Sequence, residues 1–268
     1  MQWRNQVCLL TGASGGIGQA IAHELAKRGV KLILNGRNES KLRALCARLP
    51  GNHEYYAADI SDTVQRNQLM NEINTRNDIS MLINNAGVSG FHSLENIKTN
   101  TLESLLNTNL NSPIQLTLGL LPTLKKRPQA YVINVGSTFG SIGFAGFSAY
   151  CASKFGLRGF TESLLRELAD TTIRVFYLAP RTTSTAINSD TVNQLNTALG
   201  NPVDDPNTVA QALILQLQQN QARQFIGWPE KLFVKINGAF PQWVDNALLK
   251  KLPIIKKFTN KNPVEVTP

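Results

Sequence analysis

Cysteine is scarce in this chain, and its positions suggest no pairing. The three cysteines, Cys8, Cys46 and Cys151, are an odd number with no metal-ligand spacing between them. We therefore expect neither a disulfide framework nor a zinc site. Scarce, unpaired cysteine is typical of a reducing compartment, so we expect a cytoplasmic protein without a structural metal.

Long apolar runs are also missing. No stretch approaches the ~18 residues that a membrane-spanning helix requires. Residues 1–6 lead directly into the first apolar run, and we expect no signal peptide. The 268 residues, 42% of them hydrophobic, suffice for one large α/β domain, although length alone would also permit two.

Acidic residues are few in the C-terminal part of the chain. The net charge is +9, and residues 231–268 hold seven lysines against only Asp245 and Glu265. The segment contains no recognised nucleic-acid-binding module, so we do not expect nucleic acid as a partner.

Short apolar runs alternate with segments of helical periodicity along residues 6–227. Strands are predicted at 6–10, 31–35, 53–58, 79–83, 130–135, 173–178 and 224–227. Predicted helices between them include 19–28, 39–49, 61–75, 99–121, 155–170 and 206–218. This alternation predicts a doubly wound parallel sheet in a three-layer α/β/α domain.

A glycine-rich turn joins the first strand to the first helix. Gly12, Gly16 and Gly18 allow close approach of the backbone to a pyrophosphate, and the helix N-terminus favours an anion. Ser14 and Ile17 of the same turn are expected to contact the cofactor. The spacing differs from the common dinucleotide-binding and P-loop patterns. The alternative is a turn that only packs helix on strand.

No acidic residue follows the second strand, where one would bind the ribose hydroxyls of NAD. Arg37 and Asn38 stand there instead. A guanidinium group fits a phosphate better than a diol, so we expect NADP(H) as the cofactor. The alternative is a solvated surface arginine.

Polar motifs follow the other strands too. In parallel sheets, ligands bind at the carboxyl ends of the strands. Asp59 is expected to accept a hydrogen bond from an adenine amino group. The remaining expected cofactor contacts are Ile60, Asn85, Ala86, Gly87, Pro180, Thr183 and Thr185.

Tyr150 and Lys154 are four residues apart and would share one face of a helix. A nearby lysine cation would lower the pKa of the phenol, which could then exchange a proton with a carbonyl or alcohol. Ser137, at the end of a predicted strand, could donate to the same oxygen. Asn109, inside the predicted helix 99–121, could bind a water, deform the helix or face solvent. A Tyr-x-x-x-Lys pair alone is weak evidence, since it often occurs by chance.

Taken together, the motifs resemble those of the short-chain dehydrogenase/reductase family over about residues 5–227. The match rests on Thr11-Gly-x-x-x-Gly-x-Gly18, Asn84-Asn-Ala-Gly87, Asn109, Ser137 and Tyr150-x-x-x-Lys154, all in family order. The resemblance implies one Rossmann-like domain with a seven-stranded sheet, in a dimer or tetramer.

The resemblance also implies roles for these residues. Tyr150 would donate the proton, while Lys154 would lower its pKa and bind the nicotinamide ribose. Ser137 would orient the carbonyl, and Asn109 would hold a water in a proton relay. Thr185 would lie near the nicotinamide half of the cofactor.

One position departs from the family, which usually has Pro-Gly after the sixth strand. Here Arg181 follows Pro180. The arginine would either add an anion contact in the pocket or face solvent.

Residues 228–268 form an extension beyond the catalytic domain of residues 1–227. It combines apolar residues with lysine pairs, and Gly238, Pro241 and Pro253 would divide it into short amphipathic pieces. Such a segment can bind an anionic membrane surface, here through residues 229–261. The alternatives are docking on its own domain or a subunit interface.

We expect an NADP(H)-dependent carbonyl reductase or alcohol dehydrogenase. The alternative is an NADP-binding regulator or scaffold without turnover. Residues 88–98, 139–147 and 186–200 are expected to line the pocket. Phe91, Phe139, Phe144 and Phe147 would make the pocket apolar, which suggests a lipophilic ketone, aldehyde or acyl group.

Overall fold

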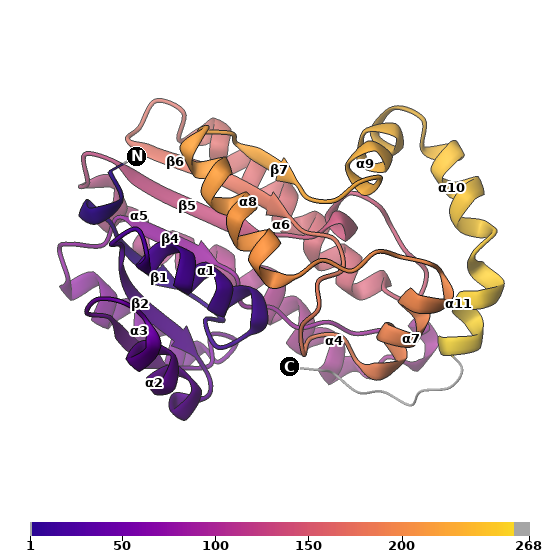
Figure 1. Ribbon diagram of the computed structural model, residues 1–268, viewed down its shortest axis with the longest axis horizontal. Coiled ribbons are helices and arrows are strands. Elements are labelled where there is room, and N and C mark those ends of the chain that lie inside the picture. The colour runs from indigo at the N-terminus through magenta and orange to yellow at the C-terminus, as the bar shows by residue number, and fades with distance from the viewer. Residues whose placement is uncertain (1, 260–268) are drawn as a thin grey trace.

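The apolar runs form seven strands, all parallel, in one sheet of a computed structural model that describes residues 2–259 (Figure 1). The sheet order is β3-β2-β1-β4-β5-β6-β7, which confirms the predicted doubly wound, Rossmann-like architecture. The strands are β1 (Val7–Leu10), β2 (Lys31–Gly36), β3 (Glu54–Ala57), β4 (Met81–Asn84), β5 (Ala130–Val135), β6 (Ile173–Ala179) and β7 (Arg223–Phe225).

Successive residues of the central strands point to opposite faces of the sheet, because side chains alternate along a strand. Leu9 and Val132 belong to the core on one face, and their neighbours Leu10 and Ile133 to the core on the other. The strands are apolar on both faces because helices cover both.

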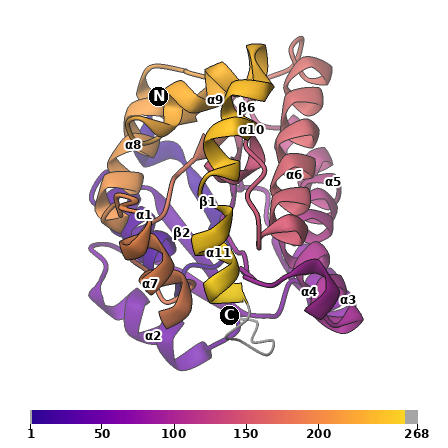
Figure 2. The same cartoon turned by 90° about the vertical axis from the view of Figure 1, so that its right-hand side faces the viewer.

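Two layers of helices enclose the sheet (Figure 2). The layer against Leu10 and Ile133 consists of α1 (Gly16–Ala26), α2 (Glu39–Arg48) and α8 (Pro206–Gln218). The opposite layer consists of α3 (Thr63–Thr75), α5 (Ser112–Lys125) and α6 (Ser148–Glu167).

Several helices begin where the sequence supplies a cap. The Asp62 side chain accepts a hydrogen bond from the Gln65 amide at the start of α3. Asp205 caps α8, and Pro206 occupies its first turn, where a missing N–H costs nothing.

The single helix predicted for residues 99–121 is wrong in two respects. The segment is divided into α4 (Thr99–Leu106), a π-helical turn (Asn107–Asn111) and α5. Pro122 does not end the helix, because α5 continues to Lys125. A proline this close to the C-terminal end removes one backbone hydrogen bond without stopping the last turn.

The extension forms three short helices, α9 (Glu230–Ala239), α10 (Pro241–Leu249) and α11 (Leu252–Thr259). We call these three helices the arch (Figure 1). Its breaks fall at Phe240 and at residues 250–251. Gly238 and Pro253, which were expected to divide it, lie inside α9 and α11.

The arch touches the domain at both of its ends. Val234 of α9 packs on Ile142, and Ile255 of α11 packs on Leu195 of α7 (Asp190–Ala198). α10 connects the two ends. The predicted extension 228–268 and membrane-contacting range 229–261 continue past the described part of the chain. No helix within residues 2–259 is long and apolar enough to cross a membrane.

The sheet order reverses between β1 and β4, whose carboxyl ends are adjacent. A crevice at such a point is the usual ligand site of an open α/β sheet. The turns that follow β1, β4, β5 and β6 carry most of the expected site residues, so the topology brings them together.

Candidate active site

The glycine turn after β1 is packed too closely to accept side chains. A methyl group at Gly12, where φ is +62°, would lie 2.7 Å from the Ala86 Cα. One at Gly16 would lie 2.6 Å from the Thr185 Cγ2, and one at Gly18 would overlap the Gly12 carbonyl oxygen. The glycines are therefore required by packing, as well as by any ligand.

The same turn leaves room for an anion. Gly15, the residue before α1, provides no side-chain hydrogen bond to the first helical amides. Those amides have no partner within the helix and are suited to a pyrophosphate. Ile17, in the first turn of α1, lines the pocket described below.

Asn85 holds the glycine turn in place. Its Nδ2 donates to the carbonyl oxygens of Thr11 at 3.0 Å and Gly12 at 3.1 Å. The Thr11 hydroxyl in turn accepts from the amides of Asn85 and Ala86. The side chain and the backbone amide of Asn85 thus join the β1 and β4 turns, and Asn85 and Gly87 both line the pocket.

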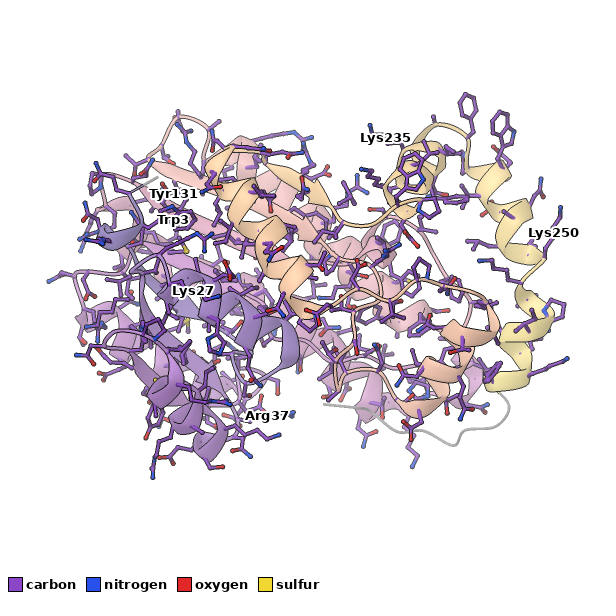
Figure 3. All side chains as sticks on the ribbon, in the orientation of Figure 1. Trp3, Lys27, Arg37, Tyr131, Lys235 and Lys250 are labelled. Carbon is purple, nitrogen blue, oxygen red and sulfur yellow. The ribbon has the colours of Figure 1, made fainter. Side chains whose placement is uncertain are left out.

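The residues expected to bind the adenosine end of the cofactor lie after β2 and β3. Some of their side chains already have hydrogen-bond partners and others do not. Arg37 is exposed, and no hydrogen bond or ion pair involves its guanidinium within residues 2–259 (Figure 3). The Ser14 hydroxyl lies 3.1 Å from where a Gly36 side chain would begin. Asn38 caps α2 by accepting from the Lys41 amide, so its side chain is already occupied.

Asp59 and Ile60 are also held by neighbours. Asp59 Oδ1 accepts from the amide of Ser61 at 2.8 Å and from its hydroxyl at 2.7 Å. The Ile60 carbonyl accepts from buried Arg66 and Ser112. Both residues follow β3, and their contact with the cofactor stays a prediction. Arg66 and Ser112, which fix this turn, carry no sequence signal that would have revealed them.

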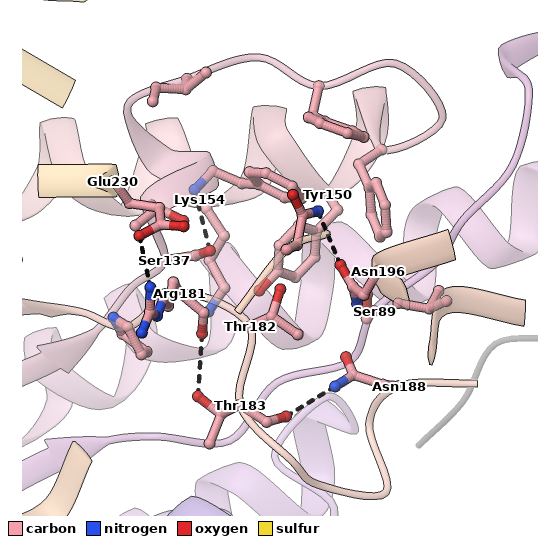
Figure 4. Close-up of a pocket in the computed structure, with 18 of the residues that line it drawn as sticks. Ser89, Ser137, Tyr150, Lys154, Arg181, Thr182, Thr183, Asn188, Asn196 and Glu230 are labelled. Carbon is pink, nitrogen blue, oxygen red and sulfur yellow. Dashed lines mark hydrogen bonds and ion pairs between the residues drawn. The ribbon is translucent and has the colours of Figure 1, made fainter. Parts of the chain in front are cut away.

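Tyr150 and Lys154 lie together on α6, beside Ser137 at the end of β5 (Figure 4). Lys154 Nζ donates to the Val135 carbonyl oxygen at 3.1 Å and lies 5.8 Å from the centre of the Tyr150 ring. The Ser137 Oγ accepts from the Phe139 amide at 3.1 Å. All three side chains line the same pocket.

The electrostatics of this group differ from expectation. Burial raises the pKa of Tyr150 to about 12, and a side-chain hydrogen bond with Ser137 opposes the rise. Burial lowers the pKa of Lys154 to about 8. The expected lowering of the phenol pKa by Lys154 is therefore absent, because the lysine ammonium is directed to the Val135 carbonyl and desolvation dominates both groups.

Asn109 lies in the π-helical turn and is fully buried. Its Oδ1 accepts from the Val88 amide, and its Nδ2 donates to the Val88 carbonyl and the Ser153 hydroxyl. Local deformation of the helix is confirmed, and a solvated face is excluded. The side chain anchors the segment after β4, and the water relay stays a prediction.

Tyr177 of β6 supports Ser137 and was missed by the sequence analysis. Its hydroxyl donates to the Ser137 carbonyl at 3.3 Å and accepts from the Ser137 amide at 3.4 Å. Side chains at Gly136 and Gly140 would collide with this ring. A tyrosine within an apolar strand gives no sequence signal of such a role.

The loop after β6 brings Pro180, Thr183 and Thr185 to the pocket wall. The Thr183 hydroxyl donates to the Arg181 carbonyl, and the Thr183 carbonyl accepts from the Asn188 side chain (Figure 4). The Thr185 hydroxyl is buried beside Gly16 and has no hydrogen-bond partner within residues 2–259. An orphaned hydroxyl beside the glycine turn fits a cofactor group that would occupy this point.

Arg181 neither faces solvent nor provides a free anion site, so both expectations for it were wrong. Its guanidinium pairs with both oxygens of Asp204, at 3.0 and 2.7 Å, and with Glu230 at 2.9 Å. It also donates to the Trp228 carbonyl and packs on Gly227. Arg181 therefore links the loop after β6 to the start of the arch. Its positive charge is neutralised by these two carboxylates.

The substrate side of the site is a pocket of about 390 Å³ with largely apolar walls. Phe139, Phe144 and Phe147 line it as expected, whereas Phe91 lies outside the lining, with its ring centre 5.0 Å from that of Phe147. Val192, Leu195 and Leu199 from the α7 region form another wall. The arch closes the pocket with Phe233, Val244, Ala247, Leu248 and Lys251. The extension thus docks on its own domain.

Known proteins share this fold. The family model described as short chain dehydrogenase matches residues 6–196. Over 181 residues, 67% of this chain and 74% of the relative, the chain is 33% identical to 3-oxoacyl-[acyl-carrier-protein] reductase FabG of Escherichia coli (strain K12).

Solved structures agree. A short-chain dehydrogenase from Sphingobium yanoikuyae in complex with NADPH has a TM-score of 0.78 at 23% identity, covering 90% of this chain and 95% of its own. A metagenomic short-chain oxidoreductase in complex with NADP has a TM-score of 0.69 at 27% identity, covering 83% and 96%. The NADP bound by the metagenomic oxidoreductase agrees with the expected NADP(H). The matched family model covers well over half of the chain, which therefore belongs to the short-chain dehydrogenase/reductase family of oxidoreductases.

Proposed function

We propose that this protein is an NADP(H)-dependent reductase that interconverts a lipophilic carbonyl compound and its alcohol, with Tyr150 as the acid–base. The observation that carries the proposal is the meeting of Tyr150, Ser137 and Lys154 on one wall of an apolar pocket that also reaches Ile17 at the glycine turn.

The residues present fit the cofactor. The uncapped amides of α1 suit the pyrophosphate, and the exposed, unpaired Arg37 suits the phosphate that distinguishes NADP from NAD. Thr185, with its orphaned hydroxyl, and Asn85 and Gly87 would hold the nicotinamide end. When bound, NADPH supplies the hydride.

The side chains supply the proton and hold the charge. A pKa of about 12 keeps the Tyr150 phenol protonated near neutral pH, as a donor to a carbonyl oxygen requires. The Ser137 hydroxyl is placed to hydrogen-bond the same oxygen. Lys154, with a pKa of about 8, is mostly cationic at pH 7 and stabilises negative charge that develops on the phenol. The Ser137–Tyr177 contacts keep this arrangement rigid.

The pocket lining supports an apolar substrate. Aromatic rings on one side face aliphatic side chains of α7 and of the arch, so an apolar substrate would be removed from water on binding. The similarity to 3-oxoacyl-[acyl-carrier-protein] reductases supports a carbonyl of the acyl type as one member of this class.

We further propose that the enzyme acts as a homo-oligomer. Leu118 on α5 and Phe155 on α6 are 63% and 42% exposed, and such side chains are suited to an interface between copies. Sedimentation velocity of wild type and of a Leu118→Glu, Phe155→Glu variant tests this. Monomeric wild type would contradict it.

The alternative is a cofactor-binding regulator that does not turn over. The complete set of Asn109, Ser137, Tyr150 and Lys154 favours the enzyme, because a regulator without turnover would not need all four groups.

Steady-state kinetics test the proposal. NADPH oxidation is measured with a series of aliphatic and aromatic ketones, aldehydes and 3-oxoacyl thioesters of increasing chain length. We expect kcat/KM to increase with apolar surface, by roughly three- to fivefold per methylene while the pocket has room. No turnover of any compound, together with tight NADPH binding, would favour the regulator.

A further inference from the structure

We propose that the outer face of the arch docks on an anionic lipid bilayer and presents the substrate pocket to that surface. The proposal rests on the proposed function, since it names the surface from which the lipophilic carbonyl compound is taken. It stands on three observations: exposed aromatic side chains in and next to the arch, unpaired lysines on the helices of the arch, and the pocket on the opposite side of the same helices.

The aromatic cluster is unusually exposed. Half of the twelve large, solvent-exposed hydrophobic side chains of residues 2–259 fall between residues 228 and 249. The most exposed are Trp228 (62%), Phe240 (53%), Trp243 (65%) and Leu249 (61%). The rings of Phe240 and Trp243 stack on each other with centres 4.9 Å apart and planes within 18°. Each therefore leaves one broad face to solvent, whereas a ring that packs on its own domain would be covered.

The lysines of the arch have no carboxylate partners in the described part of the chain. Lys231, Lys235, Lys250, Lys256 and Lys257 are all exposed, and no ion pair within residues 2–259 involves any of them. Lys231 Nζ lies 5.6 Å from the centre of the Trp228 ring. Lys235 and Lys250 mark α9 and the end of α10 in Figure 3.

The acidic residues of the arch do not neutralise these lysines. Glu230 is committed to Arg181, at 2.9 Å, so Asp245 is the one carboxylate of α9, α10 and α11 outside that ion pair. The described arch therefore presents a net positive surface.

This combination fits a bilayer surface of negative charge. Tryptophan and other aromatic rings favour the membrane interface, where an apolar body and a polar edge are both satisfied. Each lysine near an anionic surface adds an attractive contribution. A symmetric contact with a second copy is disfavoured, because a two-fold interface would place the same lysines against each other.

The pocket lies on the inner side of the same helices. Val244 and Leu248, one turn apart on α10, line the pocket, whereas their neighbours Trp243 and Leu249 point to solvent. One helix thus separates the substrate site from the proposed bilayer contact. A lipophilic carbonyl compound dissolved in the bilayer would need to pass only the edge of this helix to reach Tyr150.

Vesicle co-sedimentation with the full-length protein tests the proposal. Vesicles of phosphatidylcholine alone are compared with vesicles that contain about one third phosphatidylglycerol. We expect binding to the anionic vesicles, and at least about tenfold weaker binding for the Phe240→Ser, Trp243→Ser variant, because two exposed rings no longer enter the interface. Neither residue lines the pocket, so reduction of a water-soluble aldehyde without vesicles should be unchanged.

Two controls make the result specific. Val64→Ser removes a side chain of similar exposure, 64%, from α3 and should leave vesicle binding unchanged. A Lys235→Gln, Lys250→Gln variant should weaken binding to anionic vesicles and reduce its salt dependence.

Absence of wild-type binding to anionic vesicles would overturn the proposal. So would equal binding of wild type and the Phe240→Ser, Trp243→Ser variant. If wild type self-associates without lipid and this variant does not, the occupant is a second copy and the proposal also fails. Vesicle binding is measured without turnover, and aldehyde reduction without vesicles, so failure here is distinct from failure of the reductase function.

Discussion

The ammonium group of Lys154 lies 5.8 Å from the centre of the Tyr150 ring and donates its hydrogen bond to the Val135 carbonyl instead of the phenol. Both side chains lose solvation on burial. The pKa of Lys154 therefore falls, and that of Tyr150 rises. This relationship keeps the phenol protonated and leaves the lysine mostly cationic near neutral pH.

The cost of burying Lys154 predicts a pH dependence of stability. The pKa of this lysine falls from an ordinary 10.5 to about 8 on folding, so between those values the unfolded state binds more protons. The free energy of unfolding of wild type should therefore rise with pH from about 8 to 10.5, relative to Lys154→Met. Urea denaturation of both proteins at several pH values measures this difference.

Lys126→Met, a change at an exposed lysine, corrects for the general effect of losing one positive charge. A wild-type stability that falls, or stays constant, relative to Lys154→Met across this pH range would contradict the burial argument.

Arg37 should determine the preference for NADPH. We expect Arg37→Asp to raise the KM for NADPH by roughly 10- to 100-fold, because a phosphate then meets a carboxylate instead of a guanidinium. The KM for NADH should change little. Lys41→Asp, an equal charge change at an exposed site of α2, is the matched control. Unchanged cofactor preference in Arg37→Asp would refute the NADP(H) assignment.

The Arg181–Glu230 ion pair should hold the arch over the pocket. Glu230→Gln keeps the side-chain shape but weakens the link between the loop after β6 and α9. We expect the KM for the carbonyl substrate to rise severalfold while the Kd for NADPH stays within about twofold, since Arg181 keeps its two bonds to Asp204. Asp245→Asn, at a carboxylate of the arch without an ion pair, is the control.

Removing the Arg181 guanidinium is expected to lower the stability of the protein more than Glu230→Gln does. Arg181→Met leaves Asp204 and Glu230 without their partner and should destabilise the protein by roughly 1–3 kcal/mol. Thermal unfolding measures this loss. If Arg181→Met is as stable as wild type and keeps its substrate KM, the ion pairs do not position the arch.

Sequence alone predicted the doubly wound parallel sheet and the shared helix face of Tyr150 and Lys154, because each rests on local patterns. Alternating apolar runs gave the strands, and the spacing of Tyr150 and Lys154 placed both on one face of α6. The carboxyl ends of parallel strands then had to converge.

Features that depend on packing between distant segments were not predictable. Arg181 reaches Asp204 and Glu230, which are 23 and 49 residues away, and no local pattern specifies such partners. Tyr177 supports Ser137 from another strand. The predicted shift in the pKa of Tyr150 had the wrong direction. Burial of the phenol raises its pKa, and the sequence does not show how deeply a side chain is buried.

The most direct test of the account is the Tyr150→Phe variant, assayed for NADPH binding and for carbonyl reduction in parallel. Phenylalanine keeps the ring but removes the hydroxyl, so we expect the Kd for NADPH to stay within about twofold of wild type. The kcat should fall by at least about 10²-fold, because the phenol that donates the proton is gone. A Tyr150→Phe enzyme that reduces the same carbonyl compound at near wild-type kcat would contradict the central role given to this phenol.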